Sequence, residues 1–234
     1  MQIEIWSDIS CPFCYIGKRN FESGLVTFPG KDKLNIIWKS FQLDPDLPEA
    51  EMFSHEEYLS TRKGLAKEQV EKLLEHVTQM AKSVGLDYHF DKVATVNSYK
   101  AHRVIQIAKT KGLGERAEEL FFKAYFTEGK NIADDVVLVA VGKEIGLTEV
   151  EVREALTNEL YSQKVDTDIY EAQQVGVRGV PFFVFDNKYA ISGAQPADAF
   201  TQTLEKVYSE WQQKQAQNNL EIIDGMACGV DGCD

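Results

Sequence analysis

The spacing of hydrophobic residues in this 234-residue chain changes twice, from strand-like to helical and back. This division into two strand-bearing ends and a helical middle constrains the fold more than any other feature. Between about 54 and 174 the apolar residues recur at helical spacing. The alternation typical of strands occurs only toward the two ends, at 2–7, 33–43, 180–185 and 189–191. A helical stretch to about Phe28 follows the first strand, and another helix begins at Pro196. The predicted order is β-α-β, about six helices, β-β-α and a tail.

This order predicts an α/β fold in which the two outer pieces form one sheet with flanking helices. The expected parts are a discontinuous domain at 1–48 and 176–212, an all-helical insertion at 49–175, and a tail at 213–234. Capping boxes at Ser54 with Glu57 and at Thr148 with Glu151 mark helix starts within the insertion. Asn97 is the expected N-cap of a helix that ends before Gly112.

Composition and charge exclude several classes of protein. With 44% hydrophobic and 26% charged residues, the chain has the composition of a globular protein and is too apolar for a disordered one. Its 25 Lys and Arg against 37 Asp and Glu give a net charge of −12, so nucleic acid and anionic membranes are not expected partners. The N-terminal MQIEIWSD lacks the basic and apolar regions of a secretory signal, so we expect a cytoplasmic protein.

Two cysteines lie where the first strand passes into the first helix. A thiol at a helix N-terminus faces unpaired N–H groups and the positive end of the helix dipole, which stabilise the thiolate. Cys11 and Cys14 share the first turn, and Pro12 suits that turn because its missing N–H needs no partner there. We predict a redox pair with Cys11 as the exposed attacking thiol and Cys14 as the resolving thiol. Half a zinc site or two packed core cysteines are the alternatives.

Pro181 begins the late strand, where a proline cannot donate to a central ladder. Two interpretations remain open. It is an edge-strand proline, or it is a cis proline beside the cysteine pair. In the second case its loop frees the Val180 backbone to bind a peptide-like strand and keeps a thiolate from trapping metal.

Four segments, DISCPFCYIGKRNFE, NSYKAHRV, EGKNIADD and GVPFFVFDNKYAISGAQ, resemble the FrnE-like cytoplasmic dithiol oxidoreductases, in the DsbA-like branch of the thioredoxin superfamily. The resemblance covers about 1–210. It implies a thioredoxin fold with a helical insertion, a cis Pro181 and Cys11 as nucleophile. The family usually has Trp where this chain has Phe13, which keeps an apolar cover. We expect substrates that carry a disulfide or thiols, proteins or glutathione, and neither a cofactor nor a metal.

Two other functions stay open. The chromene-carboxylate isomerase and kappa-class glutathione transferase group shares the fold and the AHR-type segment, but typically has Ser at the position of Cys11 and lacks the second cysteine. The intact pair argues against that group. A non-redox module, with zinc-binding or structural cysteines, is the second alternative.

Several polar residues have two interpretations each. His102 either faces the Cys11 thiolate or a thiol substrate, or is an ordinary histidine on a helix face. Arg103 either binds a substrate carboxylate or pairs with one of the acidic residues. Asp8 either relays protons to a buried thiol or ends the first strand. The other three histidines lack the spacing of metal ligands and are expected at the surface: His55, His76 and His89.

Cys228 and Cys233 form a second pair in the Gly-rich tail, where the intervening GVDG permits a turn tight enough to close a disulfide. Together the two pairs would supply four zinc ligands, but they lie at opposite ends of the chain. Some FrnE-like members carry such a tail pair. We predict a second redox pair that exchanges with the first.

Overall fold

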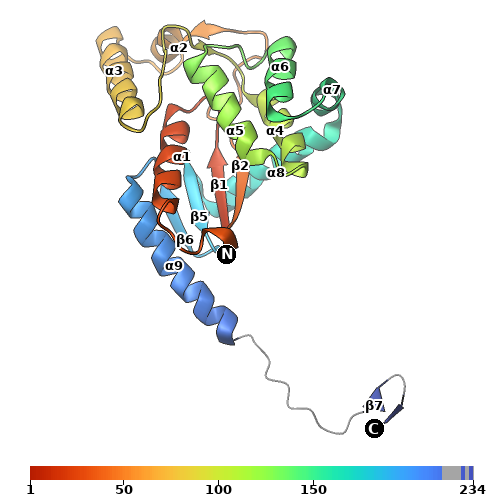
Figure 1. Ribbon diagram of the computed structural model, residues 1–234. Helices are drawn as coiled ribbons and strands as arrows, with labels where there is room; N and C mark the ends of the chain where they lie inside the picture. The colour runs from red at the N-terminus through yellow and green to blue at the C-terminus, as the bar shows by residue number, and fades with distance from the viewer. Residues whose placement is uncertain (218–227, 230–231, 234) are drawn as a thin grey trace.

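The computed structural model describes residues 1–217, 228–229 and 232–233. Its main sheet has the strand order β2-β1-β5-β6 (Figure 1). These strands are β1 (Gln2–Ser7), β2 (Asn35–Ser40), β5 (Phe182–Phe185) and β6 (Tyr189–Ser192). β1 runs parallel to β2 and antiparallel to β5, and β5 and β6 form the predicted hairpin. Strands from the two ends of the chain therefore meet in one sheet.

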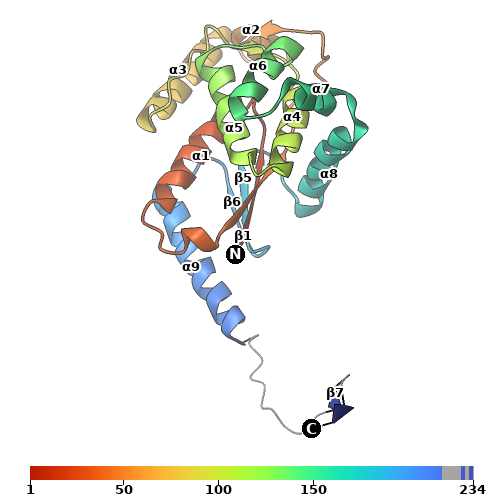
Figure 2. The same ribbon diagram turned by 45° about the vertical axis from the view of Figure 1, so that its right-hand side comes forward.

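Alternate residues of the central strands face different layers. Ile3 and Ile5 of β1 share a buried cluster with Phe200 of α9 (Ala197–Gln217), and α1 (Pro12–Leu25) packs against α9 on that face. Trp6 points the other way, toward Ala172 of α8 (Glu159–Val175). Helices thus cover both faces of the sheet (Figure 2).

The middle of the chain folds as the expected helical insertion. Besides α8, its helices are α2 (His55–Thr61), α3 (Lys67–Ser83), α4 (Tyr99–Thr110), α5 (Gly114–Phe122), α6 (Asp135–Ile145) and α7 (Glu149–Thr157), with a π-helical turn at Lys123–Thr127. A 3₁₀ turn at Lys31–Lys33 precedes β2. The capping box of Thr148 and Glu151 starts α7 as predicted, and Ser54 accepts a hydrogen bond from the Glu57 N–H at the start of α2.

Three local expectations are wrong in detail. The insertion is not all-helical, because β3 (Phe53–Ser54) pairs antiparallel with β4 (Ala94–Thr95), and two-residue strands are too short to show alternation. The N-cap of α4 is Ser98, while the Asn97 side chain accepts a hydrogen bond from Tyr99 N–H at 2.8 Å. α9 continues to Gln217, beyond the expected start of the tail, since its Gln and Lys residues are good helix formers.

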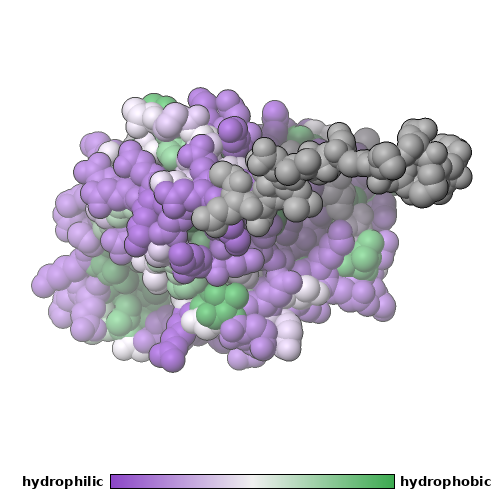
Figure 3. All heavy atoms as spheres, turned by 90° about the horizontal axis from the view of Figure 1, so that it is seen from below, coloured by the Kyte–Doolittle hydropathy of each residue, from purple (hydrophilic) through white to green (hydrophobic). Residues whose placement is uncertain are grey.

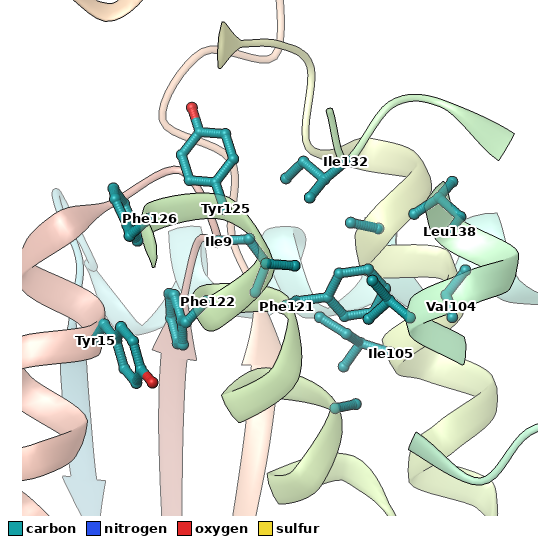
Figure 4. Packing of buried hydrophobic residues seen from close by; sticks show 14 of the residues in the cluster. Ile9, Tyr15, Val104, Ile105, Phe121, Phe122, Tyr125, Phe126, Ile132 and Leu138 are labelled. Atoms are coloured by element: carbon teal, nitrogen blue, oxygen red, sulfur yellow. The ribbon is translucent and has the colours of Figure 1, made fainter. Parts of the chain in front are cut away.

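One large apolar cluster joins the insertion to the start of α1 (Figure 4). Tyr15 of α1 stacks on Phe122 of α5 with ring centroids 4.9 Å apart, and Ile9 lies among the same side chains. The cysteines at the N-terminus of α1 belong to this cluster as well. The insertion therefore forms one wall of the region that carries the CPFC sequence.

The surface seen from below is mainly hydrophilic, with separate hydrophobic patches (Figure 3). In the described part of the chain, no helix has both the length and the hydrophobicity that crossing a membrane requires.

Candidate active site

The two N-terminal cysteines lie at the junction that the sequence predicted. Cys11 is the N-cap residue of α1, with extended backbone, and Pro12 occupies the first turn. The Cys11 N–H donates to Asp8 O at 3.0 Å, and the Cys14 N–H donates to Cys11 O at 3.0 Å. Both are free thiols. Cys11 is only 3% exposed, so the expectation of an exposed attacking thiol is wrong, because Val180 and the neighbouring loop lie over it.

Burial controls the chemistry of Cys14, which is 1% exposed. Burial raises the pKa of the Cys14 thiol well above its usual value, and the adjacent Cys11 raises it further. The Asp8 N–H and the Ser7 hydroxyl face this sulfur and oppose the shift. Cys14 is therefore a thiol at neutral pH, and it must lose a proton before it can act as a nucleophile.

The Val180–Pro181 loop meets the cysteine pair directly. The Val180–Pro181 peptide bond is cis, and the Cys11 thiol donates to the Val180 carbonyl at 3.4 Å. The Pro181 ring packs on Gly17 of α1, where an added Cβ would lie 2.8 Å from Pro181 Cγ. Gly17 thus allows the close approach of helix and loop. Phe13 is half-buried and packs against the cluster that joins α1 to the insertion.

Tyr88 is a residue of the site that the sequence analysis missed. It lies in the loop after α3, and its hydroxyl donates to Pro12 O within the CPFC turn at 2.7 Å. Its ring stacks on Phe126 with centroids 4.7 Å apart. Burial and the nearby charge of Cys11 raise the pKa of Tyr88 well above its usual value, so it is a neutral hydrogen-bond donor. A tyrosine in a loop carries no local pattern that predicts this contact.

The Asp8 side chain holds two loops beside the cysteines in place through hydrogen bonds. Its carboxylate accepts the Ser10 N–H at 3.1 Å and the Leu43 N–H at 2.8 Å, and lies 3.4 Å from His102 Nε2. Burial disfavours its ionised form, but the hydrogen bond and charge of His102, with the Leu43 N–H and Ser98, hold the pKa of Asp8 below its usual value. Asp8 is therefore a persistent anion and a weak base.

His102 and Arg103 lie on α4, and both have partners within the protein. His102 is fully buried on α4 and faces Asp8. Arg103 donates to Asn158 O at 3.1 Å, at the junction of α7 and α8. Within the described residues it forms no ion pair, so of its two interpretations the pairing with an acidic residue is not found there. The sequence could not predict which neighbour each of these two side chains faces, because α4 contacts other elements on several sides.

The prediction that the remaining histidines lie at the surface is wrong for His55. This side chain is 7% exposed, and its Nδ1 lies 2.9 Å from Thr95 Oγ1 of β4. Burial lowers the pKa of His55 to about 4, so the ring is neutral. His76 is exposed, and His89 is half-buried beside Asp87.

The tail cysteines face each other along the backbone. Cys228 is paired with Cys233 in the register of β7 (Cys228–Gly229) and β8 (Gly232–Cys233). Their side chains, on which the predicted second redox pair depends, lie outside the described part of the structure. Across residues 1–217, no group of three or more His, Cys, Asp or Glu side chains is arranged to hold a metal ion.

Comparisons with known proteins agree on the fold. The model of the family "DSBA-like thioredoxin domain" matches residues 2–205. An uncharacterized protein of Bacillus subtilis, YwbO, is 27% identical over 92% of this chain and 98% of its own length. The crystal structure of a probable DsbA oxidoreductase from Streptomyces coelicolor superposes with a TM-score of 0.86 at 36% identity, covering 100% of this chain and 98% of the other.

More distant structures share the fold alone. A 2-hydroxychromene-2-carboxylate isomerase superposes with a TM-score of 0.67 at 16% identity, over 94% of this chain and 100% of its own. The cytosolic disulfide reductase DsbM of Pseudomonas aeruginosa superposes with a TM-score of 0.64 at 17% identity, over 90% of this chain and 100% of its own.

Proposed function

This chain belongs to the DSBA-like thioredoxin domain family, and from that membership we propose that it is a thiol–disulfide oxidoreductase that works through Cys11 and Cys14. The observation that carries the proposal is the pair of free thiols on the first turn of α1, with Cys11 against the Val180 carbonyl. Cys11 is the N-cap residue of α1, at the end of the helix whose N–H groups have no partner within the helix.

In the direction of reduction, the Cys11 thiolate attacks a substrate disulfide. A Cys11–substrate disulfide forms, the substrate S–S bond breaks, and the first substrate thiolate leaves and takes up a proton. Cys14 then loses its proton and attacks Cys11 Sγ. This forms the Cys11–Cys14 disulfide and releases the second substrate thiolate. Two electrons pass from the dithiol to the substrate, and two external thiols return them, ending joined in a disulfide. Oxidation is the reverse sequence.

We further propose disulfide-bearing proteins or glutathione as substrates, and a FrnE-like enzyme that acts in the cytoplasm. The quoted sequence segments support this assignment. In addition, a structure of DsbM with GSH has been solved, and that protein has a similar fold. Pro181 would orient the Val180 carbonyl toward the disulfide that forms on Cys11.

The experiment compares the wild type with Cys11→Ser and Cys14→Ser in the reduction of insulin and of glutathione disulfide. Cys11→Ser should abolish turnover. Cys14→Ser should accumulate a Cys11–substrate disulfide that mass spectrometry detects. A matched control adds Ser23→Cys to Cys11→Ser, which restores the number of thiols at an exposed position on the same helix. It should remain inactive.

Other outcomes would replace the proposal. The fold shared with the carboxylate isomerase favours a glutathione-dependent isomerase as the second candidate. Isomerase activity that survives Cys11→Ser, without disulfide reduction, would establish that function. Stoichiometric zinc in the purified protein, lost with the cysteines, would indicate the non-redox module.

A further inference from the structure

A small polar cavity lies beside the loop that leads into the CPFC turn. Its volume is about 40 Å³, which gives room for an ammonium group and the carbon bonded to it, but not for a whole residue. Asp8 and Ser10, the residue before Cys11, line it on one side. Leu43 also lines it and is 42% exposed, so the cavity is open to solvent there. The cavity therefore adjoins the proposed attacking thiol.

A buried histidine presents a nitrogen without a partner to this cavity. His55, the first residue of α2, lines the cavity and is 7% exposed. Its Nδ1 lies 2.9 Å from Thr95 Oγ1, whereas its Nε2 bonds no described residue and is not sealed from solvent. When the ring donates its Nδ1 proton to Thr95, Nε2 is a hydrogen-bond acceptor. This acceptor needs a donor from the cavity.

Two carboxylates line the cavity, and among the described residues no Lys or Arg does. Asp44 Oδ2 accepts the Tyr58 hydroxyl at 2.9 Å. Arg62 lies 3.2 Å and Lys63 3.8 Å from the same oxygen, but both stand outside the cavity lining. Burial disfavours the ionised form of Asp44, but Arg62 and Tyr58 hold the pKa of Asp44 below its usual value, as with Asp8. Both carboxylates are therefore anions at neutral pH.

These groups fit a primary ammonium. Its three N–H donors and its positive charge match the acceptors of Asp44 and His55 and the negative charge of Asp8. Burial lowers the pKa of His55 to about 4, so the neutral ring does not repel a cation. A carboxylate or phosphate would meet two like charges. A metal ion does not fit, because within residues 1–217 no three His, Cys, Asp or Glu side chains are arranged to hold one.

We propose that this cavity binds a primary ammonium on the substrate half that becomes bonded to Cys11, so that the enzyme prefers disulfides of small aminothiols. The inference rests on the proposed dithiol function. The Cys11 thiolate bonds to the sulfur of that half, the substrate S–S bond breaks, and the other half leaves as a thiolate that takes up a proton. Cys14 then loses its proton, forms the Cys11–Cys14 disulfide and releases the first half as a thiolate. The ammonium keeps its charge throughout.

The test compares three small disulfides of similar size and different charge. Reduced wild-type protein is oxidised by cystamine, by bis(2-hydroxyethyl) disulfide and by dithiodiglycolate, and the remaining thiols are counted after acid quenching. Each rate constant is divided by that of the same disulfide with dithiothreitol, which corrects for the leaving-group pKa. The corrected rate for cystamine should exceed that for the neutral disulfide about tenfold or more, and dithiodiglycolate should react more slowly than either.

A matched pair of variants separates the cavity from general surface charge. Asp44→Asn should lower the ratio of the cystamine rate to the neutral-disulfide rate at least about threefold. Asp46→Asn removes the same charge at an exposed position of the same loop and should keep the wild-type ratio. The ratio does not depend on how much of a variant is folded, because both rates come from the same folded molecules.

A wild-type ratio near one would overturn the inference without any variant. So would a ratio that Asp44→Asn leaves unchanged, or one that both variants lower equally. If none of the three disulfides oxidised the wild-type thiols, the proposed dithiol function itself would fail. Oxidation by the neutral disulfide therefore tests the function, and the ratio tests the cavity.

Discussion

Glu118→Gln should stabilise the folded protein at pH 8 and change it little at pH 5. The folded-state pKa of Glu118 is raised from 4.5 to about 7 by burial. A carboxyl with a raised pKa favours folding most fully below its unfolded pKa, and this contribution is lost as the pH rises through the folded pKa. The wild type therefore loses stability between about pH 4.5 and 7, because ionised Glu118 is buried without an ion pair.

The size of the effect follows from the shift. Raising the pKa from 4.5 to about 7 corresponds to about 3 kcal/mol at pH 8, since one pKa unit is about 1.4 kcal/mol. A neutral glutamine avoids this loss, so up to about 3 kcal/mol of stability should be gained at pH 8 and under about 1 kcal/mol at pH 5. In a chain of this length the gain at pH 8 corresponds to roughly 6–12 °C in Tm.

Urea unfolding followed by circular dichroism at the two pH values measures the difference. Other carboxyls titrate equally in both proteins, so their contributions cancel in the comparison. Glu115→Gln, exposed on the same helix, serves as the control and should show no pH-dependent difference. If Glu118→Gln lowered the stability by the same amount at both pH values, Glu118 would not be a buried carboxyl that ionises near neutrality, and the reasoning would be refuted.

Four further predictions concern other parts of the molecule. Asp168→Ala removes the acceptor shared by Ser40 N–H, Gln106 and Lys109, and should cost about 3–5 kcal/mol in urea unfolding; a loss under about 1 kcal/mol would contradict this role. Tyr88→Phe removes the donor to Pro12 O and should cost about 1 kcal/mol by the same measurement, with an unchanged midpoint as the contrary result. The CPFC pair has no charged or hydrogen-bonding residue between its cysteines, so a redox titration should place its potential toward about −200 to −270 mV and away from the roughly −120 mV of DsbA. We also propose that Cys228→Ser with Cys233→Ser slows turnover with a small-molecule redox couple; equal turnover, with no tail disulfide trapped on Cys11 in a Cys14→Ser background, would count against the exchange.

Local chemistry made much of this protein predictable. The four sheet strands and the order of the helices follow from apolar periodicity, because a strand repeats its faces every second residue and a helix about every 3.6. Helix starts at Ser54 and Thr148 follow from side chains that accept N–H groups within the same turn. The position of Cys11 and Cys14 at the start of α1 could also be predicted, because the strand, the proline and the two cysteines are adjacent in the sequence.

Contacts between distant segments had to be decided by the tertiary structure. Tyr88 reaches Pro12, His102 reaches Asp8, and His55 is buried beside Thr95 of a ribbon too short to show a strand pattern. None of these side chains has a local signal, because burial and pairing depend on which faces meet after the insertion packs on the sheet. The sequence by itself therefore determined the order of the four main-sheet strands and of the helices, and the position of the dithiol. The packing of α4, α5 and the loops around the dithiol decided how deeply the two sulfurs are buried and which charged groups surround them.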